Sequence, residues 1–135
     1  MDEYTIEARL PTVERFRELR AAAGMTDRSR AAVERGLPNS LFGVVAVHTP
    51  SDETVAMARV VGDDGAIYHI CDMAVHPDHQ RRGLGTRLME RVLAYLDRTA
   101  PPDAYVNLMA DVDGFYERFG FEETRPASKG MYYRT

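Results

Sequence analysis

The sequence predicts an α/β fold: a single domain over residues 1–135 in which helices flank a mixed, mostly antiparallel sheet. Three observations predict this class. The length of 135 residues is common for one domain. Strand-like runs follow one another across a hairpin-type turn, Gly-Asp-Asp-Gly at residues 62–65. Helices and strands do not alternate as repeated units, which argues against an all-parallel sheet.

The first half of the chain combines one short strand, two helices and two longer strands. Residues 4–8 read as a strand, and Pro11-Thr12 then starts a helix that Gly24 ends. Asp27 is expected to cap a second, more polar helix over residues 28–35. The Val-rich runs 41–47 and 54–61 predict two antiparallel strands.

The second half is organised around one long amphipathic helix. A strand over residues 66–75 stops before Pro77, and the helix at 83–98 places apolar residues at four-residue steps, so we expect it to lie on the sheet. The remaining predicted elements are a strand at 105–110, a short helix at 114–119 and two closing strands at 121–124 and 130–133.

Composition and charge restrict the classes of function. The 17 Lys and Arg against 21 Asp and Glu give a net charge of −4, which argues against nonspecific nucleic-acid binding. The single cysteine, Cys71, excludes an internal disulfide framework and favours a reducing, cytoplasmic location. The chain lacks the run of about 18 apolar residues that a membrane span needs, and its acidic start is unlike a signal peptide. We therefore expect a cytoplasmic protein without nucleic-acid or membrane partners.

The segment 73–86 carries the most informative chemistry, because a strand there runs into a loop with two arginines and two glycines that opens the long helix. Backbone N–H groups at a helix N-terminus bind phosphate oxygens, and arginine adds charge-assisted donors. A Walker loop is excluded because no lysine precedes Thr86, and a dinucleotide loop because Leu88 occupies its third glycine position. On these residues alone, a glycine-rich surface turn is the alternative.

Two motifs resemble those of one family. The segment 80–85, Gln-Arg-Arg-Gly-Leu-Gly, resembles the acetyl-CoA pyrophosphate loop of the GCN5-related N-acetyltransferase (GNAT) family. The segment 115–121, Phe-Tyr-Glu-Arg-Phe-Gly-Phe, is similar to the family's second signature, in the same order and at a matching separation. The resemblance covers essentially the whole chain. It implies a GNAT-like fold whose sheet splays open, with the pantetheine arm of acetyl-CoA in the opening.

The resemblance also implies which residues bind acetyl-CoA. The backbone of the strand before the loop pairs with the pantetheine amides, and the loop surrounds the pyrophosphate. Asn107 either bonds the cofactor arm or is an ordinary strand residue, since the acidic segment after it, with Asp111 and Asp113, departs from the family pattern. The implied cofactor-binding residues are Met73, Ala74, Val75, Arg81, Arg82, Gly83, Leu84, Gly85, Thr86, Asn107 and Tyr116.

Acetyl transfer to an amine needs a base, a stabilised oxyanion and a proton for the departing thiolate. His69 stands where the resemblance places a base, although a structural strand histidine is the alternative. Strand alternation puts His69, Cys71, Met73 and Val75 on one face and Asp72 on the other, where Asp72 is either a rival base or a brace. The resemblance implies that the Met73 N–H meets the oxyanion.

Tyr116 corresponds to the tyrosine that donates a proton to the coenzyme A thiolate in the family, and core packing is the alternative reading. Cys71 is not expected to be a nucleophile. His76 and His79 make at most a weak metal site, so we expect no metal.

The predicted function is an acetyl-CoA-dependent N-acetyltransferase that moves the acetyl group directly to a primary amine, a small-molecule amine in the leading interpretation. A cationic amine suits Asp111, Asp113 and the acidic surplus. The alternatives are a protein lysine or N-terminal acetyltransferase and a non-catalytic coenzyme A-binding sensor. Family resemblance also suggests a homodimer formed through the closing strands.

Overall fold

The computed structural model describes residues 2–135 and contains one five-stranded sheet in the order β1-β2-β3-β4-β5. The first four strands are antiparallel neighbours, and β5 runs parallel to β4. The predicted α/β class with a mixed, mostly antiparallel sheet is therefore confirmed. The strands are β1 (Tyr4–Glu7), β2 (Phe42–His48), β3 (Glu53–Gly62), β4 (Ile67–Val75) and β5 (Tyr105–Leu108).

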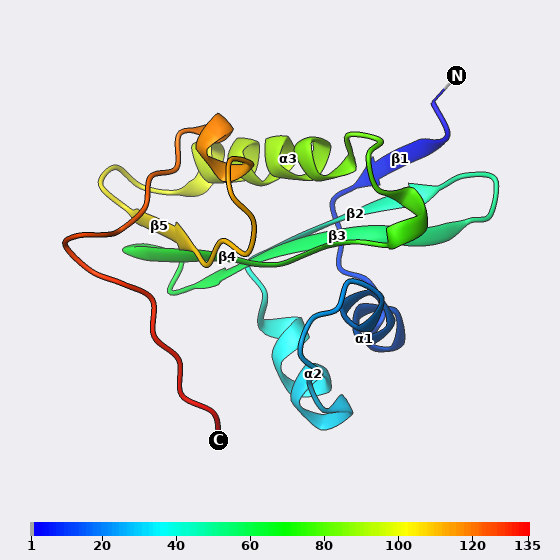
Figure 1. Cartoon of the computed structure of the whole chain (residues 1–135), viewed down its shortest axis with the longest axis horizontal. Helices are drawn as coiled ribbons and strands as arrows, with labels where there is room; N and C mark the ends of the chain where they lie inside the picture. The colour runs from blue at the N-terminus through cyan, green and yellow to red at the C-terminus, as the bar shows by residue number, and fades with distance from the viewer. Residues whose placement is uncertain (1) are drawn as a thin grey trace.

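Helices cover both faces of this sheet. Figure 1 shows α1 and α2 on one face and α3 on the other. We call these the α1/α2 face and the α3 face. The α-helices are α1 (Val13–Ala22), α2 (Arg30–Gly36) and α3 (Leu84–Thr99). The 3-10 helices are η1 (Leu37–Asn39), η2 (Pro77–His79) and η3 (Tyr116–Phe119).

The first two helices begin at hydroxyl caps. The Thr12 hydroxyl accepts a hydrogen bond from the Arg15 N–H at 3.1 Å, as the Pro-Thr start of the pattern predicts. The prediction that Asp27 caps α2 was wrong, because the cap is Ser29, whose Oγ accepts from the Ala32 N–H at 3.1 Å. Such a cap stabilises a helix by about 1 kcal/mol, since it satisfies an otherwise unpaired donor.

Each face of the sheet has its own apolar layer. The amphipathic pattern of the long helix is confirmed, because one side of α3 is buried against the α3 face of the sheet. The α1/α2 face is filled from both helices. The α3 layer includes Leu84, Leu88, Met89, Val92 and Leu96 with Tyr68 and Ile70 of β4, and the α1/α2 layer includes Phe16, Leu19, Val33 and Leu37 with Met57 and Ala74.

The two predicted closing strands, 121–124 and 130–133, are absent from the described residues, so this prediction was wrong. A strand forms only where a neighbour offers its backbone, and in Figure 1 the C-terminal segment runs away from the sheet. Met131, Tyr132 and Tyr133 are consequently 83–90% exposed. No helix within residues 2–135 is long and apolar enough to cross a membrane.

Candidate active site

The sheet opens between β4 and β5. Parallel pairing joins β5 only to Ile67–Ile70 of β4, with His69 opposite Asn107. Beyond Ile70, β4 continues to Val75 with β3 as its only strand partner among the described residues. The other edge of this stretch therefore offers backbone N–H and C=O groups to an extended ligand. This is the splay that the family resemblance implies.

A bulge at Asp72 changes which residues of β4 share a face. Asp72 has a φ of 57°, and the register with β3 shifts between Met57 and Arg59. One extra residue on a strand reverses the alternation beyond it. Met73 therefore packs in the α3 layer, whereas Asp72 contacts Arg20 of α1. The prediction of His69 and Met73 on one face and Asp72 on the other was wrong: Asp72 lies with His69 on the α1/α2 face.

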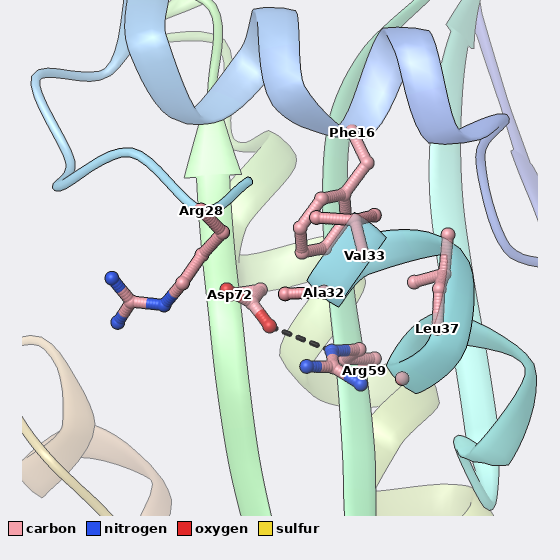
Figure 2. A pocket seen from close by; sticks show the side chains of 8 residues that line it. Phe16, Arg28, Ala32, Val33, Leu37, Arg59 and Asp72 are labelled. Carbon is pink, nitrogen blue, oxygen red and sulfur yellow. Dashed lines mark hydrogen bonds and ion pairs between the residues drawn. The ribbon is translucent and has the colours of Figure 1, made fainter. Parts of the chain in front are cut away.

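Asp72 is held by two arginines, and its side chain is only 8% exposed. Its Oδ1 pairs with Nη1 of Arg20, and its Oδ2 accepts from Nε of Arg59 at 2.6 Å. Figure 2 shows the contact with Arg59, whose Nη1 also donates to the Ser40 hydroxyl at 3.1 Å. Both carboxylate oxygens are thus engaged. These contacts hold α1 against the sheet. The sequence left two roles open for Asp72, a base or a brace, and these contacts are those of a brace.

His69 is held by its cross-strand neighbour. Its Nδ1 lies 2.7 Å from Oδ1 of Asn107. In the tautomer with the proton on Nδ1, the ring donates to this amide oxygen, and Nε2 keeps its lone pair. The ring is half-buried on the α1/α2 face, beside the point where β4 leaves β5. Nothing in the sequence pattern showed this contact, because it depends on the register of two strands 38 residues apart.

The glycine-rich loop forms a cradle at the start of α3. Gly83 is the N-cap with a φ of 75°, and no atom lies within 4 Å of where its Cβ would be. The N–H groups of the first helical turn have no partners within the helix, so they are available to a ligand. The side chain of Leu84 is buried, which leaves its backbone to face a ligand. The cradle is lined by Val75, His79, Gln80, Arg81, Gly83, Leu84, Gly85, Thr86 and Phe115.

Charged side chains border this cradle without strong partners. Arg81 and Arg82 are both exposed. Nη1 of Arg82 lies 3.6 Å from Oε2 of Glu3, in a pair whose side chains are about half exposed. Exposed pairs of this kind stabilise little, so the guanidinium can turn toward a phosphate at low cost. The residues present therefore fit a pyrophosphate.

The two sequence motifs meet at this loop. A Cβ on Gly85 would lie 3.3 Å from the Phe115 ring, so glycine permits the close approach of η3. Nη2 of Arg118 donates to Oγ1 of Thr86 at 3.2 Å. Both contacts place Tyr116 beside the start of α3.

Tyr116 lies in the α3 layer and is 7% exposed. Its ring contacts Phe115 and Phe121 at centroid distances of 5.0 and 6.3 Å. Burial, followed by the charge of Asp111, raises the pKa of the Tyr116 phenol above its usual value. The phenol therefore stays protonated at neutral pH, the state that a proton donor needs.

Two further side chains complete the surroundings. Burial raises the pKa of the Cys71 thiol to about 12, so little thiolate exists at neutral pH. His79 links β1 to the loop, because its Nδ1 lies 2.7 Å from the Tyr4 hydroxyl. No feature of the sequence pattern predicts that contact. Within residues 2–135, no three His, Cys, Asp or Glu side chains gather closely enough to hold a metal ion.

Comparisons with known proteins agree with this geometry. A family model described as an acetyltransferase (GNAT) domain matches residues 38–123. A solved structure from Staphylococcus aureus, described as a probable acetyltransferase of unknown function, has a TM-score of 0.92 and 37% identity, and the match covers 98% of this chain and 99% of that one.

Two curated relatives match over most of the chain. An uncharacterized N-acetyltransferase, ycf52 of Porphyra purpurea, is 25% identical over 98% of this chain and 77% of its own length. The chloroplastic serotonin N-acetyltransferase 2 of Oryza sativa is 30% identical over 87% of this chain. The match covers only 60% of the rice protein, so the chain spans less than two thirds of that relative.

Proposed function

Because the chain belongs to the GNAT acetyltransferase family, we propose that it moves an acetyl group from acetyl-CoA directly to a small-molecule primary amine. One observation carries the proposal. The opening between β4 and β5 begins next to the His69–Asn107 pair. The cradle, which fits phosphate oxygens, lies at the other end of β4. A thioester entering along β4 would thus have a base at one end and phosphate donors at the other.

The residues that would hold acetyl-CoA border the opening between β4 and β5 and the cradle at the start of α3. The backbone of Met73, Ala74 and Val75 borders the opening and pairs with amide groups of the ligand. The first-turn N–H groups of α3, from Leu84 to Thr86, donate to the pyrophosphate oxygens together with Arg81 and Arg82. When bound, acetyl-CoA supplies an acetyl group activated as a thioester.

In this proposal, His69 accepts through Nε2 the proton that the amine loses as its nitrogen bonds to the acetyl carbon. Tyr116 donates its phenolic proton to the sulfur as the carbon–sulfur bond breaks. The proton held by His69 is then released to solvent, and solvent reprotonates Tyr116. The Met73 N–H, at the bulge, is proposed to stabilise negative charge on the acetyl oxygen. Asn107 is a positioning residue, since it fixes the tautomer of His69. Asp72 braces α1 instead of removing protons.

Removing the loop arginines is expected to weaken acetyl-CoA binding. Arg81→Ala and Arg82→Ala should each raise the Kd about tenfold, since a hydrogen bond to a charged group contributes about 1.5 kcal/mol. Titration calorimetry at two salt concentrations measures this, with a larger effect at low salt. Arg91→Ala, exposed on α3, is the control and should leave the Kd unchanged. The same Kd for acetyl-CoA in the wild type and in all three variants would argue against this site.

The pH dependence of the rate tests the base. His69→Ala should lower kcat/KM about 100-fold at neutral pH and abolish the fall in rate on the acid side of the profile. Asn107→Ala should lower kcat/KM about tenfold. It should keep the fall in rate on the acid side of the profile (the acid limb), because the imidazole remains. The assignment is wrong if His69→Ala retains both the rate and the acid limb.

Assembly and location are further parts of the proposal. The edge strand β5 and the exposed Met131, Tyr132 and Tyr133 offer a surface for pairing with a second copy of the chain. Light scattering should then give twice the mass of 15.2 kDa. We also propose that residues 1–135 act as one domain inside the cell, where acetyl-CoA is available.

A further inference from the structure

A second cavity lies on the α1/α2 face, between α2 and the middle of β3 and β4. Its volume is about 170 Å³. The cavity is large enough to hold several water-sized groups. Phe16, Val33 and Leu37 form its apolar wall, and Arg28, Arg59 and Asp72 supply its charged groups (Figure 2). We call it the arginine pocket.

Positive charge exceeds negative charge around the arginine pocket. The carboxylate of Asp72 already pairs with Arg20 and Arg59, so one carboxylate faces two guanidinium groups there. Arg28 adds a third, and among the described residues its guanidinium donates only to the neutral carbonyl of Asp27, from Nη1 at 3.3 Å. The carboxylate of Asp27 pairs with Arg17 at 3.5 Å. In the view of Figure 2, Asp72 lies between Arg28 and Arg59.

The arginine pocket shares a face with the proposed base. Arg59 pairs with Cys71 across the sheet, and Val61 pairs with His69. The step from one pair to the next is two residues, on the order of 7 Å along a strand. A ligand anchored at Arg59 can therefore extend along this face toward the His69 ring.

We infer that the acceptor is an amine that also carries a carboxylate, and that Arg28 and Arg59 bind this carboxylate in the arginine pocket. The inference rests on the proposed acetyl transfer. Guanidinium groups recognise carboxylates through paired N–H donors, and Nη2 of Arg59 is not used by Asp72 or Ser40. The apolar wall suits a hydrocarbon chain between the two ends of the acceptor. The carboxylate takes no part in the bonds that form and break.

Matched acceptors test the inference. The pairs 6-aminohexanoate with pentylamine, and 5-aminopentanoate with butylamine, each differ only by replacement of the carboxylate with hydrogen. For at least one pair, we expect kcat/KM for the acid to exceed that for the plain amine about tenfold or more. If both plain amines react as well as their acids, the inference is overturned while acetyl transfer itself stands.

Arg28 offers a variant that keeps the buried ion pairs intact, because its side chain is exposed and outside them. Arg28→Glu should raise the KM for the preferred acid about tenfold or more and change the KM for the matching amine less than twofold. Arg91→Ala, on the other side of the sheet, should change neither value. If Arg28→Glu leaves the acid's KM unchanged, the inference is wrong.

Direct binding separates failure of the inference from failure of the proposed function. Calorimetric titration of 6-aminohexanoate and 5-aminopentanoate into protein saturated with coenzyme A requires no turnover. Binding that Arg28→Glu abolishes supports the arginine pocket even if no acetyl group is transferred, in which case the proposed function fails. Absence of binding by both acids overturns the inference.

Discussion

Tyr116→Phe is expected to lower kcat about 100- to 1000-fold while the Kd for acetyl-CoA stays the same. The substitution removes only the hydroxyl, and general acid catalysis contributes about that factor. The ring remains to pack against Phe115 and Phe121, so the fold should persist. Because burial raises the pKa of this phenol, the wild-type rate should not fall as pH increases through the range where free tyrosine ionises.

A matched tyrosine provides the control for this experiment. Tyr95 is buried in the same α3 layer, where it stacks on Phe42 at a centroid distance of 4.5 Å. Tyr95→Phe should leave kcat within about twofold of wild type. Thiol release gives kcat, and calorimetry gives the Kd. An unchanged kcat in Tyr116→Phe would show that another group protonates the sulfur.

Asp72→Ala is expected to lower the free energy of unfolding by about 3–5 kcal/mol, because it leaves two guanidinium groups without their buried partner. Arg20 is the more affected, since its side chain is only 7% exposed. Urea denaturation followed by circular dichroism measures the loss. Asp72→Asn should destabilise as well, because it removes the charge while keeping the size of the side chain.

Glu34→Ala is the control for Asp72→Ala, because it removes an exposed ion pair instead of a buried one. Glu34 pairs with Arg30 at 2.7 Å on the surface of α2, and such pairs contribute less than about 1 kcal/mol. A loss in Asp72→Ala no larger than that in Glu34→Ala would contradict the bracing role. It would also reopen Asp72 as a candidate base.

Local signals in the sequence predicted most of the framework. The four-residue apolar step predicted α3, and the arginines and glycines before it predicted a loop that the structure forms as an open cradle. These features depend on neighbours in the chain, so a single sequence reveals them. The closing strands were wrong because the C-terminal segment runs away from the sheet (Figure 1), so the strand-like residues at 130–133 lie beside no strand of the described residues.

Two features of the candidate site could not be predicted from the pattern of residues in the sequence. Aspartate adopts a positive φ more readily than most residues, yet nothing in the run around Asp72 shows that it does so here. That single bulge decides which side chains share a face with His69. The contact between His69 and Asn107 likewise requires the register of β4 and β5, which only the folded sheet provides.

The most direct test of the account is a thiol-release assay of the wild-type protein with acetyl-CoA and a panel of amines, in which the acetylated amine is quantified by mass spectrometry. The account predicts that at least one small primary amine yields free coenzyme A and acetylated product in equal amounts. A protein that binds acetyl-CoA tightly, yet releases no thiol above background with any amine of the panel, would contradict it.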